Sequence, residues 1–350
     1  MPNPTRRAAL AGLAATALVG PARAAAPRPR PAPGGPTALD PARLAAAADR
    51  ARALPQLHAL VIARGGEIAL AEAFRGPPPD RPAPIKSVSK TIHAALVGCA
   101  LDRGVLRSPR QTLAETAPAL IPPGADPRVA ALTLADLLSM QAGLERTSGP
   151  NYGRWVESRD WVAHALTRPF TAEPGAEMLY STGSYHVLGA ALAEAADRSL
   201  LDLARDWLGE PLGVEIPPWT RDPQGRFMGG NQMALSPLAL IRFGEAHRTG
   251  GTHAGRRVLS RDWVEAAWTP RTRSPWSGDA YGWGWFLREA AGRPVAYARG
   301  YGGQFLWVAP SLGLTVAVTS DPTRPARSAG YAGALQRLLE EAILPAAEAA

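Results

Sequence analysis

The sequence predicts an α+β fold, in which an antiparallel sheet of about five strands is flanked by the N- and C-terminal helices and carries an inserted, mostly helical lobe. Two observations predict the sheet. Two apolar, strand-like runs surround Gly65-Gly66, and β-rich runs separated by turn residues begin near Tyr281. Short connections make such neighbouring strands antiparallel. The expected strand runs are 58–64, 68–73, 284–288, 294–299, 304–309 and 314–319.

Helix-capping residues predict where the helices begin. Asp40-Pro41 combines an N-cap residue with proline at the first helical position, so we expect a helix that runs to Leu54. The remaining expected helices cover 87–103, the segment from Thr133 to Met140, 184–196, segments opened by Ser236-Pro237 and by Ser260, and about 328–343.

The first 24 residues have the pattern of an export signal. Arg6-Arg7 precede an apolar run over 8–20, and the small-x-small sequence Ala22-Arg23-Ala24 follows. Paired arginines are typical of the twin-arginine route, so we expect a periplasmic or extracellular protein. The apolar run is too short to span a bilayer, and no stable membrane anchor is expected. A disordered alanine-rich tail is the alternative.

The composition of the remaining residues indicates a short tether followed by one domain. Residues 25–36 are rich in proline and alanine and are expected to form a tether. We expect residues 37–350 to form one domain. Its sheet part covers about 37–86 and 237–350, and the helical lobe covers about 87–236.

Charge and cysteine content exclude several functions. The formal net charge is +8, but five arginines precede residue 36, and the remainder carries +3 without a basic block. Nucleic acid is therefore not an expected partner. The single Cys99 excludes an internal disulfide, and the scattered histidines give no metal-site pattern, so no metal or cofactor is expected. Only two of the 38 basic residues are lysines, Lys86 and Lys90, and no role is assigned to Lys86.

A Ser-x-x-Lys pair is the strongest catalytic signal. Ser87 stands at the start of an expected helix, and Lys90 lies three residues later on the same face. A serine hydroxyl becomes a good nucleophile when a base takes its proton. A lysine can be that base only when it is neutral, and burial favours the neutral form. An exposed lysine on a helix surface is the alternative.

Two further segments add candidate residues. Tyr180-Ser181-Thr182 precedes an alanine-rich helix, and a tyrosine beside a lysine can relay protons. Arg299-Gly300-Tyr301 enters a strand, where glycines let a ligand approach backbone N–H groups that stabilise an oxyanion. A core-edge tyrosine and a tight β-turn are the respective alternatives. Five tryptophans are candidates for an apolar pocket or for core packing, namely Trp155, Trp161, Trp283, Trp285 and Trp307.

Taken together and in this order, the three segments resemble those of the penicillin-recognising serine hydrolases. The resemblance is strongest to the class C β-lactamase-like branch, which includes esterases, D-amino-acid peptidases and 6-aminohexanoate-dimer hydrolases. It spans roughly residues 38–345. Further segments that fit are 134–144, Pro174-Gly175 through Tyr180-Ser181, 236–244 and 281–285.

The resemblance implies a mechanism. Ser87 would be acylated, Lys90 and Tyr180 would share proton transfer, and water would release the acyl group. The backbone N–H groups of Ser87 and of the Arg299, Gly300 and Tyr301 stretch would bind the oxyanion, with Thr182 beside the substrate. The resemblance thus implies an exported serine hydrolase that acts on a small ester, amide or peptide.

Two departures from the family pattern bear on the substrate. Thr182 stands where the family often has asparagine, and the stretch Tyr297 to Gly300 lacks the family's lysine or histidine. Both favour an esterase or amide hydrolase. A β-lactamase or D-Ala peptidase is one alternative, and a non-catalytic cell-wall or peptide-binding relative is another. The sequence leaves the oligomeric state open.

Overall fold

A computed structural model describes residues 29–30, 38–326 and 330–348. The expected signal segment 1–24 lies outside the described residues, as does all of the expected tether except residues 29 and 30. No helix in the described ranges is both long enough and apolar enough to span a lipid bilayer.

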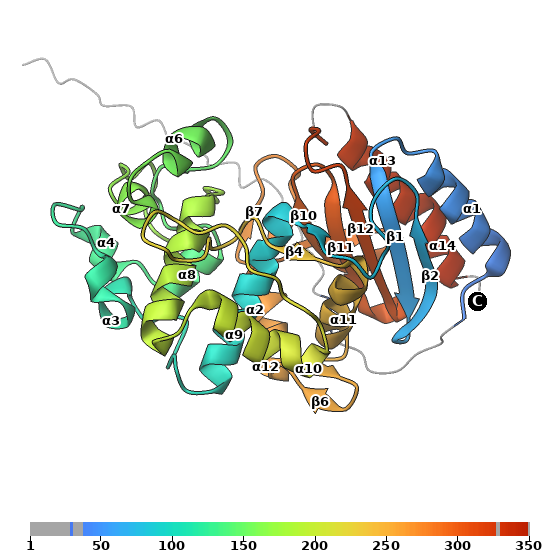
Figure 1. Cartoon of the computed structure of the whole chain (residues 1–350), viewed down its shortest axis with the longest axis horizontal. Helices are drawn as coiled ribbons and strands as arrows, with labels where there is room; N and C mark the ends of the chain where they lie inside the picture. Colours follow the sequence, from blue (N-terminus) through green and yellow to red (C-terminus); the bar gives the residue numbers. More distant parts are fainter. Residues whose placement is uncertain (1–28, 31–37, 327–329, 349–350) are drawn as a thin grey trace, which may run out of the picture.

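A twisted antiparallel sheet forms the right-hand part of the molecule in Figure 1. Within the described residues it has eight strands, in the order β2-β1-β12-β11-β10-β9-β8-β7. The predicted antiparallel sheet is confirmed, and two-residue strands extend it at one edge. Its strands are β1 (Leu57–Arg64), β2 (Glu67–Ala73), β7 (Thr272–Arg273), β8 (Ala280–Tyr281), β9 (Phe286–Ala290), β10 (Arg293–Gly300), β11 (Gln304–Ala309) and β12 (Leu314–Ser320). Two small ribbons pair β3 (Ala83–Pro84) with β4 (Ala234–Leu235) and β5 (Thr252–His253) with β6 (Arg256–Arg257).

The helices that cover the sheet come from both ends of the chain and from its later half. They are α1 (Pro41–Arg52), α11 (Pro237–Arg248), α13 (Tyr331–Leu338), the short π-helix η6 (Leu339–Ile343) and α14 (Leu344–Glu348), with the 3-10 turn η5 (Pro310–Leu312) before β12. Helix α12 (Arg261–Ala267) packs through Trp263 against the interior of the molecule. The predicted cap of the first helix is confirmed, because the Asp40 side chain accepts a hydrogen bond from the Arg43 backbone N–H over 2.8 Å.

Side chains on neighbouring residues of β12 show which helices cover which face. Successive residues of a strand point to opposite faces. Thr315 donates a hydrogen bond to Glu245 of α11. Its neighbour Leu314 pairs with Arg64 of β1, whose guanidinium donates to the Ala347 carbonyl of α14 over 2.6 Å. Helix α11 therefore covers one face and the terminal helices cover the other.

Most of the middle of the chain is helical and lies at the opposite end of the molecule from β1 and β2 (Figure 1). The predicted inserted helical part is thus present, while its limits at 87 and 236 stay a prediction. Its elements are α3 (Leu113–Thr116), η2 (Pro118–Leu120), α4 (Arg128–Ala131), α5 (Leu134–Leu138), η3 (Gly149–Asn151), α6 (Tyr152–Val156), α7 (Trp161–Leu166), α8 (Thr182–Ala196), α9 (Leu200–Ala204), the π-turn η4 (Arg205–Gly209) and α10 (Glu210–Leu212).

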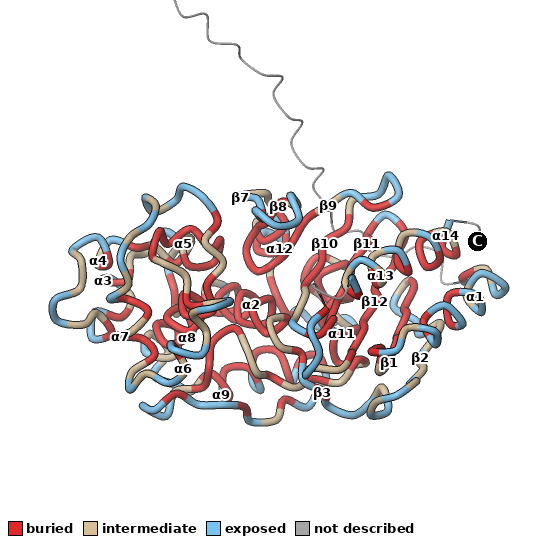
Figure 2. The backbone as a smooth tube through the Cα atoms, turned by 90° about the horizontal axis from the view of Figure 1, so that it is seen from above, coloured by how far each residue is buried: buried red, intermediate tan, exposed pale blue. Residues whose placement is uncertain are grey.

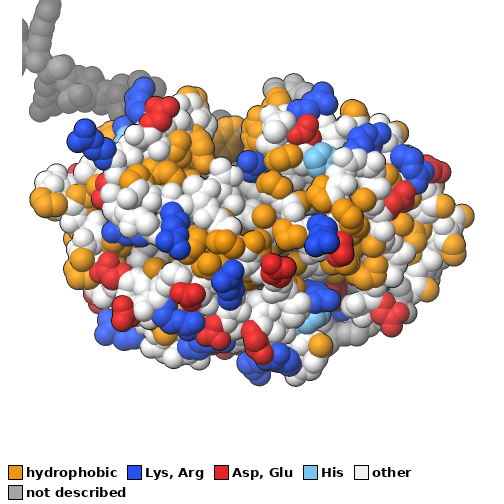
Figure 3. Space-filling model, viewed as in Figure 1, with side chains coloured by type: hydrophobic (Ala, Val, Ile, Leu, Met, Phe, Trp, Pro, Cys, Tyr) orange, Lys and Arg blue, Asp and Glu red, His pale blue; other side chains and the backbone are white. Residues whose placement is uncertain are grey.

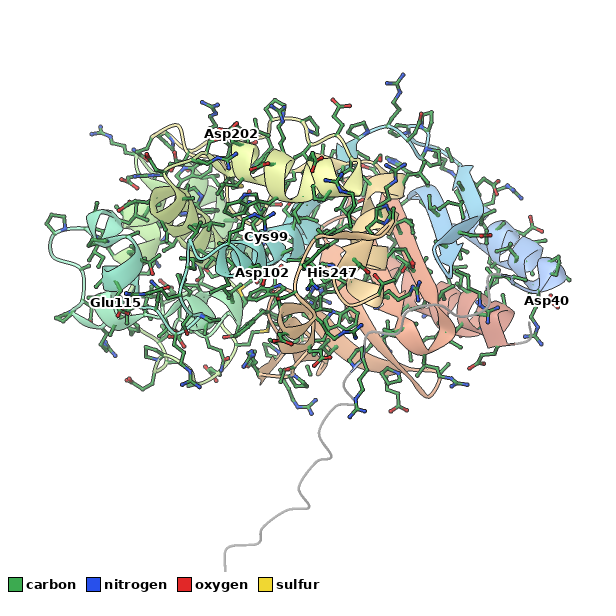
Figure 4. The ribbon with its side chains drawn as sticks, turned by 90° about the horizontal axis from the view of Figure 1, so that it is seen from below. Asp40, Cys99, Asp102, Glu115, Asp202 and His247 are labelled. Atoms are coloured by element: carbon green, nitrogen blue, oxygen red, sulfur yellow. The ribbon has the colours of Figure 1, made fainter. Side chains whose placement is uncertain are left out.

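Helix α2 (Ser89–Asp102) joins the two parts and runs through the interior, where Figure 2 shows it buried along nearly its whole length. Every residue from Ser89 to Ala100 is buried, including Cys99, which points into the interior in Figure 4. Close packing fixes its position, because a Cβ on Gly98 would lie 2.5 Å from the Trp263 ring. Ser87, in the 3-10 turn η1 (Lys86–Val88), leads directly into this helix.

Basic and acidic side chains alternate over the face of the molecule in Figure 3, without a large patch of either sign.

Candidate active site

The serine and lysine of the Ser-x-x-Lys pair meet at the start of α2. Ser87 belongs to η1, and Lys90 is the second residue of the helix. Lys90 Nζ and Ser87 Oγ are 3.0 Å apart and form a hydrogen bond. This separation is within the reach that direct proton transfer requires.

Neutral oxygen atoms surround the buried Lys90 amine. Besides Ser87 Oγ, Nζ donates to Thr182 Oγ1 over 3.2 Å and to the Gly230 carbonyl over 2.8 Å. In the part of the chain that the structure describes, Lys90 has no ion-pair partner. Burial disfavours the charged amine and lowers the pKa of Lys90 from 10.5 to about 7. A substantial fraction of Lys90 is therefore neutral near pH 7 and able to accept a proton.

Tyr180 lies beside both members of the pair. It lines the same cavity as Ser87, and Lys90 Nζ lies 5.0 Å from its ring centroid. Burial raises the pKa of the Tyr180 phenol, while the nearby Ser87 hydroxyl and the charge of Arg299 act in the opposite direction. Tyr180 is thus a protonated phenol at neutral pH and a potential proton donor, whereas Lys90 is the better acceptor.

Thr182 begins α8 and connects Lys90 to the loop before α6. Its hydroxyl lies 2.9 Å from Ser148 Oγ, which also accepts the Thr182 backbone N–H over 2.9 Å. Ser181 caps the same helix and bonds to Thr147 over 3.1 Å. The acceptor that Thr182 provides for the Lys90 amine is therefore a hydroxyl and not an amide.

The third predicted segment packs directly against the residues that precede Ser87. A Cβ on Gly300 would lie 2.4 Å from the Ile85 carbonyl oxygen and 3.0 Å from Lys86 Cβ, so a larger residue there would push β10 away. Arg299 precedes this glycine, and Tyr301 follows it in an exposed turn. The structure thus brings the Arg299–Tyr301 segment to the start of η1.

These residues surround a cavity of ≈ 770 Å³. Six of the seven predicted site residues line it, namely Ser87, Tyr180, Thr182, Arg299, Gly300 and Tyr301, and the buried Lys90 bonds to two of them, Ser87 and Thr182.

The aromatic lining of the cavity differs from the sequence-based candidates. All five candidate tryptophans are buried outside the cavity lining, so core packing is the correct alternative for them. Trp276, which is 40% exposed, lines the cavity together with Tyr152 and Phe305. Trp276 also makes an edge contact with the Tyr180 ring, at 6.3 Å between centroids.

Besides the aromatic lining, several residues to which the sequence analysis assigned no role also shape the site. Gly230 and Ser148 hold Lys90 and Thr182, and Lys86 and Gln232 line the cavity. Lys86 Nζ donates to Gln232 Oε1 over 3.2 Å. Both residues have left-handed backbone conformations, with φ of 49° and 65°. Such conformations cost a side-chain-bearing residue on the order of 1 kcal/mol or more. The sequence feature that could have indicated this loop, which contains Gly230 and Gln232, is the double glycine at 229–230.

Histidines near the site support its walls. His93 is buried beside Gly230, whose backbone N–H donates to His93 Nδ1 over 3.3 Å, and burial lowers the His93 pKa to about 4. His186 lies 3.1 Å from Asp222. Among the described residues, no group of three or more His, Cys, Asp or Glu side chains is arranged to hold a metal ion.

Several solved structures share the fold. A penicillin-binding protein homologue from Caulobacter crescentus has a TM-score of 0.66 at 19% identity, over 88% of this chain and 99% of that one. EstCE1, a hydrolase with promiscuous acyltransferase activity, has a TM-score of 0.67 at 17% identity, over 84% and 98%. A Bacillus anthracis protein, provisionally assigned as a 6-aminohexanoate-dimer hydrolase, has a TM-score of 0.69 at 16% identity, over 92% and 89%. At these identities the likeness concerns the fold alone.

The match to a family model, together with this fold, defines a class, the hydrolases of the serine β-lactamase superfamily. The beta-lactamase family model matches residues 42–341, and the chain belongs to that family. No curated protein matched the sequence.

Proposed function

We propose that the protein is a serine hydrolase that cleaves an ester or amide through an acyl-enzyme on Ser87. The observation that carries this proposal is the 3.0 Å contact between Ser87 Oγ and the Lys90 amine, whose pKa burial lowers to about 7. A neutral amine at this distance activates the hydroxyl for nucleophilic attack. An arginine in its place would stay protonated and would not act as a base.

The acylation step follows from the assigned positions. Neutral Lys90 takes the proton of Ser87 Oγ as that oxygen bonds to the substrate carbonyl carbon. The N–H of Ser87 lies in the first turn of η1, where helical N–H groups lack partners within the helix. Together with an N–H of the Arg299–Tyr301 segment, it would bind the oxyanion.

Collapse of the tetrahedral intermediate breaks the bond to the leaving group. The Tyr180 phenol donates its proton to the departing oxygen or nitrogen and regains one from protonated Lys90. In deacylation, a water molecule gives its proton to neutral Lys90 and attacks the acyl carbon. Ser87 is restored when the second tetrahedral intermediate collapses and Oγ takes that proton back.

Thr182 and the third segment favour ester or amide substrates over β-lactams. The cavity offers the Thr182 hydroxyl and Arg299 at the positions where the family often has asparagine and a lysine or histidine. Two structural neighbours also point this way, the hydrolase EstCE1 and the provisionally assigned 6-aminohexanoate-dimer hydrolase. We also infer from residues 1–24 that the chain is exported by the twin-arginine route.

A fluorophosphonate probe and p-nitrophenyl esters test the proposal on the purified chain. We expect one covalent adduct, located on Ser87 by peptide mass spectrometry, and ester turnover that Ser87→Ala abolishes. Ser311→Ala, an exposed serine outside the cavity, is the matched control and is expected to retain both activities. Absence of labelling and of turnover in the wild type would contradict the proposal, and nitrocefin hydrolysis would favour the β-lactamase alternative.

A further inference from the structure

The cavity over Ser87 has a basic lining without acidic side chains. Lys86, Arg146 and Arg299 line it, and no Asp or Glu from the described part of the chain does. Within the described ranges none of the three forms an ion pair, although eleven arginines elsewhere do. Three cations around one concave site create a positive potential that attracts anions.

Aromatic rings hold two of these cations in place. The Tyr180 ring contacts both Trp276 and Phe286, with centroid separations of 6.3 Å and 6.5 Å. The Arg146 guanidinium carbon lies 5.2 Å from the Trp276 ring centroid, and that of Arg299 lies 4.5 Å from the Phe286 ring centroid. Each of the two rings that contact Tyr180 thus also lies next to a guanidinium. A guanidinium stacked on a ring keeps N–H groups that can bind a carboxylate in a bidentate manner.

Lys86 places the third cation next to the nucleophile. Its backbone is left-handed, with φ of 49°, a conformation that glycine adopts without strain and that lysine does not. Its amine is held by the neutral Gln232 Oε1 and not by a carboxylate. A lysine in this conformation, directly before Ser87, suggests that its side chain serves the site.

We propose that the cavity selects acyl donors that carry a carboxylate, with Lys86 and Arg146 as specificity-determining residues and Arg299 as a third cation. The inference rests on the proposed hydrolase function and names its substrate class. A carboxylate on the acyl chain would replace water at these cations and hold the scissile carbonyl over Ser87. Electrostatic attraction also raises the rate at which such substrates enter the cavity.

Two esters of equal chain length test this proposal. The mono-p-nitrophenyl ester of adipic acid ends in a carboxylate, and p-nitrophenyl hexanoate ends in a methyl group. We expect the wild type to favour the adipate ester at least tenfold in kcat/KM, after subtraction of spontaneous hydrolysis. The preference should fall as ionic strength rises, because salt screens the attraction.

Variants show which residues produce the preference. Lys86→Gln and Arg146→Gln should each lower the ratio of the two kcat/KM values about three- to tenfold, and Arg146→Lys should restore part of it. Arg110→Gln removes one charge at an exposed position outside the cavity and should leave the ratio unchanged. Lys86→Gly should raise the Tm through relief of strain and still lower the ratio, which separates recognition from folding.

The outcomes separate this inference from the proposed function. A wild-type ratio near one, with Ser87 still labelled and hexanoate ester still hydrolysed, would overturn the inference alone. An Arg110→Gln effect equal to that of Lys86→Gln would also overturn it, because net charge would then explain the preference. Loss of labelling and of both ester activities would reject the proposed function itself.

Discussion

Two buried basic side chains, Lys90 on α2 and Arg248 on α11, have opposite surroundings. Arg248 pairs with Glu245 over 2.8 Å, and the same carboxylate accepts a hydrogen bond from Thr315, which ties α11 to the sheet. Among the residues that the structure describes, Lys90 instead meets only neutral oxygen acceptors, those of Ser87, Thr182 and Gly230. Both side chains are buried, so burial does not distinguish them. The carboxylate partner makes Arg248 a cation that stabilises the fold, whereas Lys90, which has no such partner among the described residues, can act as a base.

The contrast also fits the two residue types. A guanidinium keeps its proton inside a protein, so the Arg248 pair contributes a fixed charge between helix and sheet. An amine loses its proton when it is buried without a carboxylate, and the Lys90 pKa falls to about 7 for this reason. The four predictions below test this comparison.

The largest expected effect comes from replacing Lys90. Lys90→Arg and Lys90→Met should each lower kcat/KM for esters about 10³-fold, because neither side chain can accept the Ser87 proton. Steady-state kinetics with p-nitrophenyl esters measure the loss, and circular dichroism checks the fold. Retention of a tenth of the activity in Lys90→Arg would show that the base is a different group.

Breaking the Arg248 pair should affect stability and not chemistry. Glu245→Gln removes the carboxylate that pairs with this buried guanidinium and should lower the free energy of unfolding by about 3 kcal/mol. Chemical denaturation measures this, and kcat per folded molecule should stay unchanged. The exposed pair of Arg50 and Glu341 provides a control, since Glu341→Gln should cost less than about 1 kcal/mol. Equal losses in the two variants would contradict the assignment.

A carboxylate placed next to Lys90 should give it a charged partner, as Glu245 is for Arg248, and should therefore favour the protonated amine. In the wild type, kcat/KM should rise with pH through about 7 as Lys90 loses its proton. Thr182→Asp should shift this rise in kcat/KM to higher pH by at least about one unit and lower activity at pH 7 about tenfold. Thr182→Ser keeps the hydroxyl and should leave the pH of this rise unchanged. An unchanged pH profile in Thr182→Asp would mean that the rise does not report the titration of Lys90.

The sequence predicted the parts of the site that local spacing encodes. Ser87 and Lys90 are one helical turn apart, so their contact follows from the helix alone. Gly230 is 140 residues from Lys90 in sequence, and its carbonyl reaches the amine only through tertiary packing. Trp276 joins the cavity in the same way, from the turn between β7 and β8.

The fold shows the same division between local and long-range information. The long strands carry apolar runs that can be read from the sequence, and the caps at Asp40 and Thr133 are confirmed. Strands β7 and β8, at two residues each, are too short to form a pattern; β8 depends on pairing with β9, and β7 on pairing with β8. Backbone conformation is equally hidden, since nothing in the residue type of Lys86 predicts a left-handed φ.

The smallest expected effect is on how stability depends on pH. In the unfolded chain Lys90 keeps its proton up to its ordinary pKa of 10.5, whereas in the folded protein it loses that proton near pH 7. Between these values the unfolded state binds more protons, so the contribution of Lys90 to the free energy of unfolding rises with pH. The slope is at most about 1.4 kcal/mol per pH unit.

Subtracting Lys90→Met from the wild type isolates this contribution, because the other titrating groups are common to both proteins. Between pH 7.5 and 9.5 the difference in unfolding free energy should rise in favour of the wild type. The same subtraction with Glu245→Gln should give a flat line, because Arg248 keeps its proton throughout that range. A flat line for Lys90→Met as well would mean that Lys90 stays charged when buried, and the distinction between the two cations would then rest on geometry alone.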